Sequence, residues 1–223
     1  MVDWKNIETV LLDMDGTVLD LYFDNYFWMQ YLPQKYAEAN HLSLDAAKTQ
    51  LFAEFSRHRG TLNWYCLDFW QRETGLDIVA LKQEVTEHIG VRPNALTFLE
   101  KVKASGRRAV LVTNAHRGSL ELKLRHVPLD LHLDAMISSH DLGLPKEDPL
   151  FWSRLEEVLH YDRSRTLLID DSLSVLRSAH NAGIAFTLGV LQPDSKAPPV
   201  DTEEFIGLDC FSTIYPPAPA PGH

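Results

Sequence analysis

The sequence predicts an α/β protein whose core is a parallel, Rossmann-like sheet, with an all-helical domain inserted into that core. Strand-like and helix-like segments alternate from residue 91 to residue 215, and this alternation is typical of a parallel sheet with helices on both faces. One more strand-like segment stands near the N-terminus, and about 70 residues of helical pattern, too many for a loop, separate it from the rest. We therefore expect a core of residues 1–19 and 91–215 and a helical domain of residues 20–90.

Each element of the core has its own signal. The apolar run that ends at Asp13 predicts a buried first strand. The other expected elements are strands over 109–114, 135–138, 166–170 and 184–190 and helices over 93–105, 119–126, 147–160 and 172–182. Residues 192–203 are polar and rich in proline, so we expect a loop at the edge of the sheet. The Pro/Ala-rich residues 216–223 are expected to be a disordered tail.

The inserted segment has four predicted helices, over 22–40, 44–59, 64–74 and 77–89. Pro33 is expected to kink or break the first of them. Ser43 is expected to cap the second helix, and Gly60 to end it. The segment has enough apolar residues to form a small bundle, so we expect residues 20–90 to be a second domain.

Composition and charge argue against several classes of function. The formal net charge of −10 disfavours binding to nucleic acid or to anionic membranes, which need a basic face. No apolar run approaches the ~20 residues that cross a bilayer, and residues 1–5 lack the pattern of a signal peptide. We therefore expect a cytoplasmic protein with a small-molecule partner, present as a monomer or a weak dimer.

Cysteine and histidine usage gives no sign of a metal centre. Cys66 and Cys210 are the only cysteines, and their spacing indicates neither a disulfide framework nor a thiolate zinc site. The ten histidines form no HExxH or comparable pattern. Only His116 stands out by position, because it follows a predicted strand closely.

Two carboxylates follow the first predicted strand. Asp13 and Asp15 are two residues apart, so the strand period places them on the same side of the backbone, and Gly16 lets the chain turn sharply after them. Close carboxylates resist joint ionisation unless a cation sits between them, which favours a divalent metal ion, most simply Mg²⁺. Asp13 would then be free to act as a nucleophile and Asp15 as acid and base. The alternative is that both are ordinary acids in a turn.

Further polar groups stand at or just beyond the ends of later core strands, namely Thr113, Asn114, Lys146, Asp170 and Asp171. Such strand ends meet at one edge of a parallel sheet, so these residues can converge with the first two carboxylates. The Thr113 hydroxyl, the amides around Asn114 and Lys146 would supply donors to a phosphoryl group. Asp171 would help to bind the metal, and Asp170 could bind it directly or through water. Taken singly, each group could instead be a helix cap or a solvated side chain.

This set of motifs resembles that of the haloacid dehalogenase superfamily. The matching residues are DxDGT at 13–17, a threonine at 113, a lysine at 146 and a DD pair at 170–171, and the inserted helices resemble the helical cap of that superfamily. The resemblance implies that Asp13 forms an aspartyl-phosphate and that Asp15 protonates the leaving alcohol and then activates water. It also implies that Thr113 and Lys146 hold the phosphoryl group, and that Asp171, the Asp13 side chain and the Asp15 carbonyl bind Mg²⁺.

Two features of the match bear on the reaction. Lys146 is followed by Glu147, Asp148 and Pro149, where many capped relatives read K-P-x-P, and this departure is expected to change loop stiffness more than chemistry. True dehalogenases of the superfamily lack the acid at position 15. Its presence here favours hydrolysis of a phosphate ester over cleavage of a carbon–halogen bond.

Substrate choice is expected to lie in the cap. Residues 21–28 and 61–70 mix aromatic side chains with amides and acids, which suits a purine but also the core of a small bundle. Both stretches, with the LLDMDGT, TNAH and PKED segments, are similar to the bacterial GMP/IMP nucleotidases. That resemblance implies hydrolysis of purine 5′-mononucleotides. The implied contacts are Asn63, Trp64 and Tyr65 from the cap, and His116 and Arg117 beside the phosphate or ribose.

Two other functions remain open at this point. A phosphatase of the same mechanism could act on another small ester, such as a sugar phosphate or phosphoglycolate. A non-enzymatic phospho-acceptor or binding module, similar to a receiver domain, also combines acids, Thr or Ser, Lys and Mg²⁺. Receivers place an acidic pair before a separate phosphorylated Asp and have no helical insertion, so this chain fits them poorly.

Overall fold

The core of the protein is a sheet of six parallel strands. The computed structural model describes residues 2–218, and its strands are β1 (Thr9–Leu12), β2 (Arg108–Thr113), β3 (Ala135–Ser138), β4 (Thr166–Asp170), β5 (Phe186–Val190) and β6 (Ile206–Leu208). They lie side by side in the order β3-β2-β1-β4-β5-β6, and every neighbouring pair is parallel. The α/β fold class predicted from the sequence is confirmed.

The central position of β1 decides where the polar residues meet. Thr9 is in register with Arg108 of β2 on one side and with Thr166 of β4 on the other. The strand order reverses direction here, and open sheets of this kind have a crevice at the carboxyl ends of the strands at such a point. The residues that follow β1, β2 and β4 therefore lie around one crevice.

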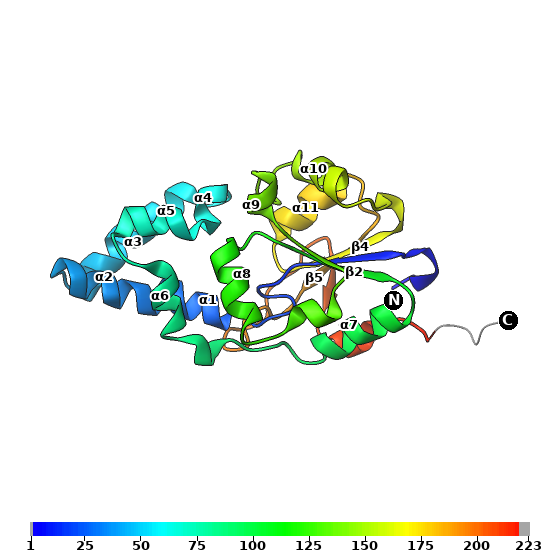
Figure 1. Ribbon diagram of the computed structural model, residues 1–223, viewed down its shortest axis with the longest axis horizontal. Helices are drawn as coiled ribbons and strands as arrows, with labels where there is room; N and C mark the ends of the chain where they lie inside the picture. The colour runs from blue at the N-terminus through cyan, green and yellow to red at the C-terminus, as the bar shows by residue number, and fades with distance from the viewer. Residues whose placement is uncertain (1, 219–223) are drawn as a thin grey trace.

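Helices cover both faces of the sheet, as Figure 1 shows. The core helices are α7 (Ala95–Ala104), α8 (Arg117–Leu124), α9 (Ser139–Leu142), α10 (Phe151–Val158) and α11 (Leu173–Asn181). α7 and α8 pack on the face that carries Val10 and Leu12, whereas α10 and α11 pack on the face that carries Leu11. Since the central strands are buried on both faces, their sequences contain continuous apolar runs such as VLL in β1.

Between β1 and α7 the chain forms a helical group that we call the helical insertion (residues 20–90). Its helices are α1 (Tyr22–Tyr26), α2 (Leu32–Asn40), α3 (Leu44–His58), α4 (Leu62–Tyr65), α5 (Leu67–Thr74) and α6 (Ile78–Gln83). In Figure 1 they lie to one side of the sheet, next to α8. Their apolar side chains, among them Phe27, Phe55 and Trp70, form a cluster of their own, which Leu122 of α8 joins.

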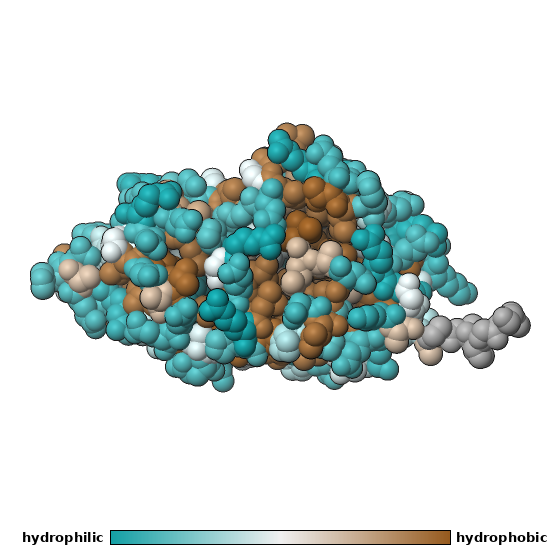
Figure 2. Space-filling view, in the orientation of Figure 1, coloured by the Kyte–Doolittle hydropathy of each residue, from teal (hydrophilic) through white to brown (hydrophobic). Residues whose placement is uncertain are grey.

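The surface is mixed in character. Figure 2 shows hydrophilic residues over the outer sides of the helices, and hydrophobic residues between the insertion helices and over the sheet. Short 3₁₀ turns occur at Trp4–Asn6, Thr86–His88, Leu129–His132, Arg163–Arg165 and Phe211–Ile214. Among residues 2–218, no helix has both the length and the apolar content needed to cross a bilayer.

The first helix of the insertion changes its winding and does not break at Pro33. Residues 22–40 remain helical, but Phe27–Tyr31 form a π-helical stretch directly before α2. Pro33 stands in the first turn of α2. A wider turn just before a proline accommodates its ring and its missing N–H without ending the helix.

Three other helices differ from the sequence prediction. The helix expected over 77–89 ends at Gln83, and only a 3₁₀ turn (Thr86–His88) follows it, because Val85 leaves the helical conformation (φ −128°, ψ 23°). The single helix expected over 64–74 is two helices, α4 and α5, because Cys66 between them is extended (φ −86°, ψ 111°). The helix expected over 147–160 begins only at Phe151. Residues 145–148 form a turn in which the Asp148 N–H donates to the Pro145 carbonyl oxygen at 3.0 Å, and Pro149 cannot donate to a helical ladder.

The end of the core contains one strand that the sequence did not predict. β6 has three residues at the edge of the sheet, too few for a periodic signal. Residues 192–203 form a loop, as expected. Of the predicted tail 216–223, Pro216 is buried, residues 217–218 are exposed without regular structure, and residues 219–223 lie outside the described residues.

Candidate active site

A cavity of about 900 Å³ lies between the carboxyl ends of the strands and the helical insertion. Its core side is lined by the residues that the sequence motifs indicated, which are Asp13, Asp15, Thr113, Asn114, Lys146, Asp170 and Asp171. The insertion contributes Asn25, Trp28, Arg59, Trp64 and Tyr65, among others. This volume is within the range of clefts that enclose small organic ligands.

Lys146 holds two of the acids together. Its ammonium contacts Asp13, lies 2.7 Å from Asp170 Oδ2 and donates to the Val112 carbonyl oxygen at 3.0 Å. All three charged side chains are nearly fully buried. Burial alone would lower the pKa of Lys146, but Asp13 and Asp170 raise this pKa above its ordinary range. Lys146 therefore stays charged and offsets part of the acidic charge at the end of β1.

The acids that follow β1 and β4 form a cluster suited to a cation. Carboxylate oxygens of Asp13, Asp170 and Asp171 lie within 4.8 Å of one another. Lys146 pairs with the first two acids but not with Asp171. Burial raises the pKa of Asp13 to about 6, and burial with the neighbouring carboxylates raises that of Asp171 well above its ordinary value. Buried oxygen donors with surplus negative charge are what Mg²⁺ requires, so the residues present fit this ion.

Gly16 brings the turn after β1 directly against this cluster. Its φ is +83°, a conformation that favours glycine. A Cβ at this position would lie 2.6 Å from Asp171 Oδ2 and 3.0 Å from Pro193 Cβ. The close approach places the backbone around Asp15 next to the Asp171 carboxylate.

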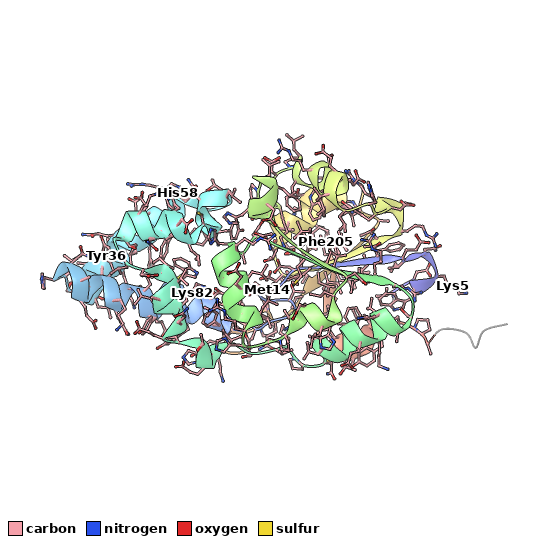
Figure 3. All side chains as sticks on the ribbon, in the orientation of Figure 1. Lys5, Met14, Tyr36, His58, Lys82 and Phe205 are labelled. Atoms are coloured by element: carbon pink, nitrogen blue, oxygen red, sulfur yellow. The ribbon has the colours of Figure 1, made fainter. Side chains whose placement is uncertain are left out.

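Two buried lysines, which the sequence motifs did not indicate, connect Asp15 to the helical insertion. Lys123 Nζ lies 2.6 Å from both Asp15 Oδ1 and Asp24 Oδ2, and Lys82 Nζ lies 2.5 Å from Asp24 Oδ1. Each lysine side chain is only 1% exposed. Burial acts to raise the pKa of both acids; that of Asp15 rises to about 6, whereas the two lysines lower that of Asp24 to about 2. Figure 3 labels Lys82 on the insertion side of α8 and Met14, next to Asp15, on the sheet side.

A second connection between core and insertion passes through Glu147. The Tyr65 hydroxyl donates to Glu147 Oε1 at 2.6 Å, and Asn114 Nδ2 donates to Glu147 Oε2 at 2.9 Å. The Lys146 backbone N–H in turn donates to Asn114 Oδ1 at 2.9 Å. Glu147, which departs from the usual lysine motif, therefore fixes the loop that carries Lys146 and ties this loop to α4.

The other candidates from the sequence are not all at the cavity. Thr113 is 1% exposed, and its Oγ1 accepts the Ala115 N–H at 3.0 Å. His116 lines the cavity. Arg117 does not line it and forms an ion pair with Asp141 at 2.5 Å.

The three consecutive residues expected as cap contacts have different surroundings. Tyr65 lines the cavity and is held by Glu147. Trp64 also lines it but packs edge-on against Phe55 and Trp70 in the core of the insertion. Asn63 is exposed and is not among the lining residues, since neighbouring positions of the one-turn helix α4 face different directions.

The structure also brings together residues whose spacing in the sequence indicated no metal centre. Ligand atoms of Cys66, His116 and His140 lie within 4.8 Å of one another. Cys66 comes from the insertion, His116 from the start of α8, and His140 from α9. They come close together only because the insertion packs against the core, and local sequence patterns do not predict that packing.

Comparison with known proteins identifies the class. A profile of haloacid dehalogenase-like hydrolases matches residues 7–183. The chain belongs to this family of hydrolases, and its reaction is the hydrolysis of phosphoric monoesters.

Individual relatives differ in how closely they match. The chain is similar to the GMP/IMP nucleotidase YrfG of Escherichia coli, with 44% identity over 215 residues that cover 96% of this chain and 97% of that protein. It is 28% identical over 163 residues, 67% of each chain, to the (S)-2-haloacid dehalogenase 4A of Burkholderia cepacia. Among solved structures, a HAD phosphatase from Thermococcus onnurineus gives a TM-score of 0.75 at 22% identity, covering 92% of this chain and 95% of that one. This last likeness concerns the fold alone.

Proposed function

We propose that the protein is a Mg²⁺-dependent 5′-nucleotidase that hydrolyses the purine mononucleotides IMP and GMP to nucleoside and phosphate. One observation carries the proposal: Asp13, Lys146 and the acid cluster face an aromatic wall of the insertion across a single cavity. The 44% identity to a GMP/IMP nucleotidase over nearly the whole of both chains supports the choice of substrate.

Asp13 is the nucleophile in the proposed reaction. One of its carboxylate oxygens attacks the phosphorus atom, the bond from phosphorus to the 5′ oxygen breaks, and an aspartyl-phosphate forms. Asp15 gives its proton to the departing 5′ oxygen. Lys146 and the Thr113 hydroxyl hold the phosphoryl oxygens while charge moves onto them. Their place beside Asp13 on the cavity wall supports this assignment.

The second step returns the enzyme to its starting state. Asp15, now a carboxylate, takes a proton from a water molecule, which attacks the phosphorus atom and releases phosphate and the Asp13 carboxylate. A pKa of about 6, raised by burial, suits a group that must both give and take a proton near neutral pH. Lys123 positions the Asp15 side chain through its contact at 2.6 Å.

Asp13, Asp171 and the Asp15 carbonyl oxygen would hold Mg²⁺, with Asp170 bound to it directly or through water. When bound, the ion offsets the repulsion between the Asp13 carboxylate and the phosphate dianion. The three clustered carboxylates support this set of ligands.

We also propose that residues 20–90 are a cap domain that closes over the phosphate and selects the leaving group. The insertion presents Trp28, Trp64 and Tyr65 to the cavity, and these rings can face a purine. Hypoxanthine and guanine share the O6 and N7 acceptors, an edge that an arginine binds with two parallel donors. Arg59 lines the cavity, is exposed, and forms no ion pair within residues 2–218, so we assign it to this edge.

The proposal is tested by measuring phosphate release from a panel of esters in the presence of Mg²⁺. We expect faster release from IMP and GMP than from CMP, UMP, ribose 5-phosphate and phosphoglycolate. Asp13→Asn removes the nucleophile and should abolish release, whereas the matched variant Asp130→Asn, at an exposed position outside the cavity, should retain it. Turnover concentrated on a sugar phosphate would keep the mechanism and reject the nucleotide assignment. Turnover of IMP by Asp13→Asn would reject the mechanism.

A further inference from the structure

A group of soft ligands lies where the helical insertion meets the core. Ligand atoms of Cys66, His116 and His140 are all within 4.8 Å of one another, and each residue is partly buried. Cys66 belongs to the break between α4 and α5, His116 caps the start of α8, and His140 lies in α9. Cys66 and His140 do not line the catalytic cavity.

One ring nitrogen of His140 is available to bind a metal. Its Nε2 is buried and has no hydrogen-bond partner among residues 2–218, although buried polar atoms are normally paired. Imidazole nitrogens are common ligands of transition metals, so an ion would give this atom the partner that it lacks.

His116 and Asp68 complete the surroundings. The rings of His116 and His140 are nearly perpendicular, at 85°, with their centroids 5.0 Å apart. His116 Nε2 lies 3.6 Å from Asp68 Oδ2, which stands on α5 two residues after Cys66. His116 Nδ1 accepts the Gly118 N–H at 3.2 Å, and ligation through Nε2 gives up this long hydrogen bond between neutral groups. A metal–nitrogen bond outweighs that loss.

We infer that Cys66, His116 and His140 form a second metal site, for a thiophilic divalent transition ion such as Zn²⁺, with Asp68, which faces the ligating His116 nitrogen, as a fourth ligand through oxygen. One thiolate and two imidazoles are ligands that Zn²⁺ takes in tetrahedral sites, whereas Mg²⁺ takes oxygen. Ligand atoms around a tetrahedral Zn²⁺ are about 3.5 Å apart. The three ligand atoms, all within 4.8 Å of one another, would therefore draw together to about 3.5 Å when an ion binds.

Because of its location, an ion at this site would affect turnover in the proposed reaction. Cys66 and Asp68 belong to the insertion, and His116 and His140 belong to the core, so the ion ties the two together. Cys66 directly follows Tyr65, whose hydroxyl is bonded to Glu147 of the lysine loop. An insertion fixed to the core cannot open to release product, so occupancy of this site slows turnover. This consequence rests on the proposed function; the binding of the ion does not.

The test uses the full chain, with its acid cluster saturated with Mg²⁺, titrated with Co²⁺ as a spectroscopic substitute for Zn²⁺. We expect a near-ultraviolet thiolate-to-Co²⁺ band and the visible bands of tetrahedral Co²⁺, because the oxygen ligands of the acid cluster give no thiolate band. Cys66→Ser should remove the thiolate band, and the matched variant Cys210→Ser should keep it. Asp68→Asn should weaken Co²⁺ binding, because a neutral amide oxygen replaces the charged carboxylate ligand.

Two further measurements separate metal binding from loss of structure and from loss of activity. His140→Gln keeps the thiol but should change the visible bands and weaken Co²⁺ binding, while circular dichroism reports whether each variant is folded. Zn²⁺ added to Mg²⁺-loaded enzyme should slow phosphate release from IMP, and Cys66→Ser should resist this inhibition. A thiolate band absent from the wild type, or retained in Cys66→Ser, would overturn the site. A thiolate band without inhibition by Zn²⁺ would confirm the metal site and show that it has no role in turnover.

Discussion

The ammonium of Lys123 lies 2.6 Å from Asp15 Oδ1, and the lysine side chain is 1% exposed. The same nitrogen is 2.6 Å from Asp24 Oδ2 in the helical insertion. Asp15, the proposed acid and base, is therefore held by a residue that also binds the insertion. Its orientation depends on where the insertion sits.

Replacement of Lys123 by methionine should slow turnover strongly and destabilise the protein. The side chain keeps its length, but Asp15 loses its buried cationic partner, and Asp24 keeps only Lys82. Breaking a buried ion pair costs about 3–5 kcal/mol in the free energy of unfolding. Misplacement of a catalytic group by about 1 Å costs up to ~100-fold in rate. Urea unfolding and phosphate release from IMP measure the two effects.

The matched control for this variant is Lys103→Met, at an exposed position of α7 outside the cavity. It should change neither stability nor turnover appreciably, since substitutions at exposed sites are usually within about 0.5 kcal/mol. If Lys123→Met retained wild-type kcat while the protein was folded, Lys123 would have no part in positioning Asp15.

Tyr65→Phe should lower kcat and part of the stability while leaving the fold intact. The variant removes one hydroxyl that donates to Glu147 Oε1 at 2.6 Å and leaves the ring in place. A lost hydrogen bond of this kind costs about 1.5–3 kcal/mol because Glu147 is charged. Glu147 also holds Asn114, and through it the loop of Lys146, so we expect kcat to fall with little change in secondary structure.

The Tyr65 prediction is checked by steady-state kinetics on IMP, with thermal unfolding measured in parallel. Asn63→Ala is the matched control, because Asn63 lies two residues away, is exposed and does not line the cavity. An equal loss of kcat in both variants would mean that α4 acts through its fold and not through the Tyr65 hydroxyl.

The sequence predicted the core and the strand-end residues because both follow from local patterns. Continuous apolar runs mark buried parallel strands, and the residues that follow them must meet at one edge of the sheet. Asp13, Thr113, Lys146 and Asp171 are all found at that edge. Element boundaries were less predictable where a single residue decides them, as at the extended Cys66 between α4 and α5.

The lysines around Asp15 were missed because lysine is assumed to face water. Helical spacing held a signal: Lys82 is four residues after the buried Ile78, and Lys123 is three after the buried Leu120. A lysine on the apolar face of a helix needs a buried partner. Which acid serves as that partner depends on the contact between insertion and core, and no local pattern reports this contact.

Arg59→Met should reduce discrimination between bases and leave the chemistry intact. The variant keeps an apolar side chain at the cavity wall but removes the donors proposed to bind O6 and N7. A good bidentate pair contributes about 1–3 kcal/mol of discrimination, so KM for GMP and IMP should rise about 5–150-fold. AMP, which carries an amino group at position 6, should be affected much less.

The Arg59 prediction is measured as kcat/KM on GMP, IMP and AMP. Arg57→Met, two residues earlier at an exposed position of α3 and outside the cavity, is the control. An equal fall in kcat/KM for all three nucleotides would show that Arg59 contributes charge or structure but does not read the base edge.

Mg²⁺ binding should weaken as the pH falls through about 6. In the metal-free protein, burial raises the pKa of Asp13 to about 6 from the ordinary value of 3.8. A raised pKa stabilises the folded protein while the acid is protonated, and this contribution is lost as the pH rises through about 6. Mg²⁺ needs the carboxylate form, so protons compete with the ion below that pH. Asp171, whose pKa is raised well above its ordinary value, adds to the competition.

The rise in unfolding temperature caused by Mg²⁺ should therefore be larger at about pH 7.5 than at about pH 5.5, since stabilisation by a ligand at a fixed concentration increases as its affinity increases. Calorimetric titration near pH 6 in buffers of different ionisation enthalpy should detect protons released as Mg²⁺ binds. Asp171→Asn should lose most of the Mg²⁺ effect, and Asp201→Asn, at an exposed position outside the cavity, should keep it. A Mg²⁺ effect of equal size at both pH values, with no proton release, would mean that these carboxylates are already ionised before the ion binds.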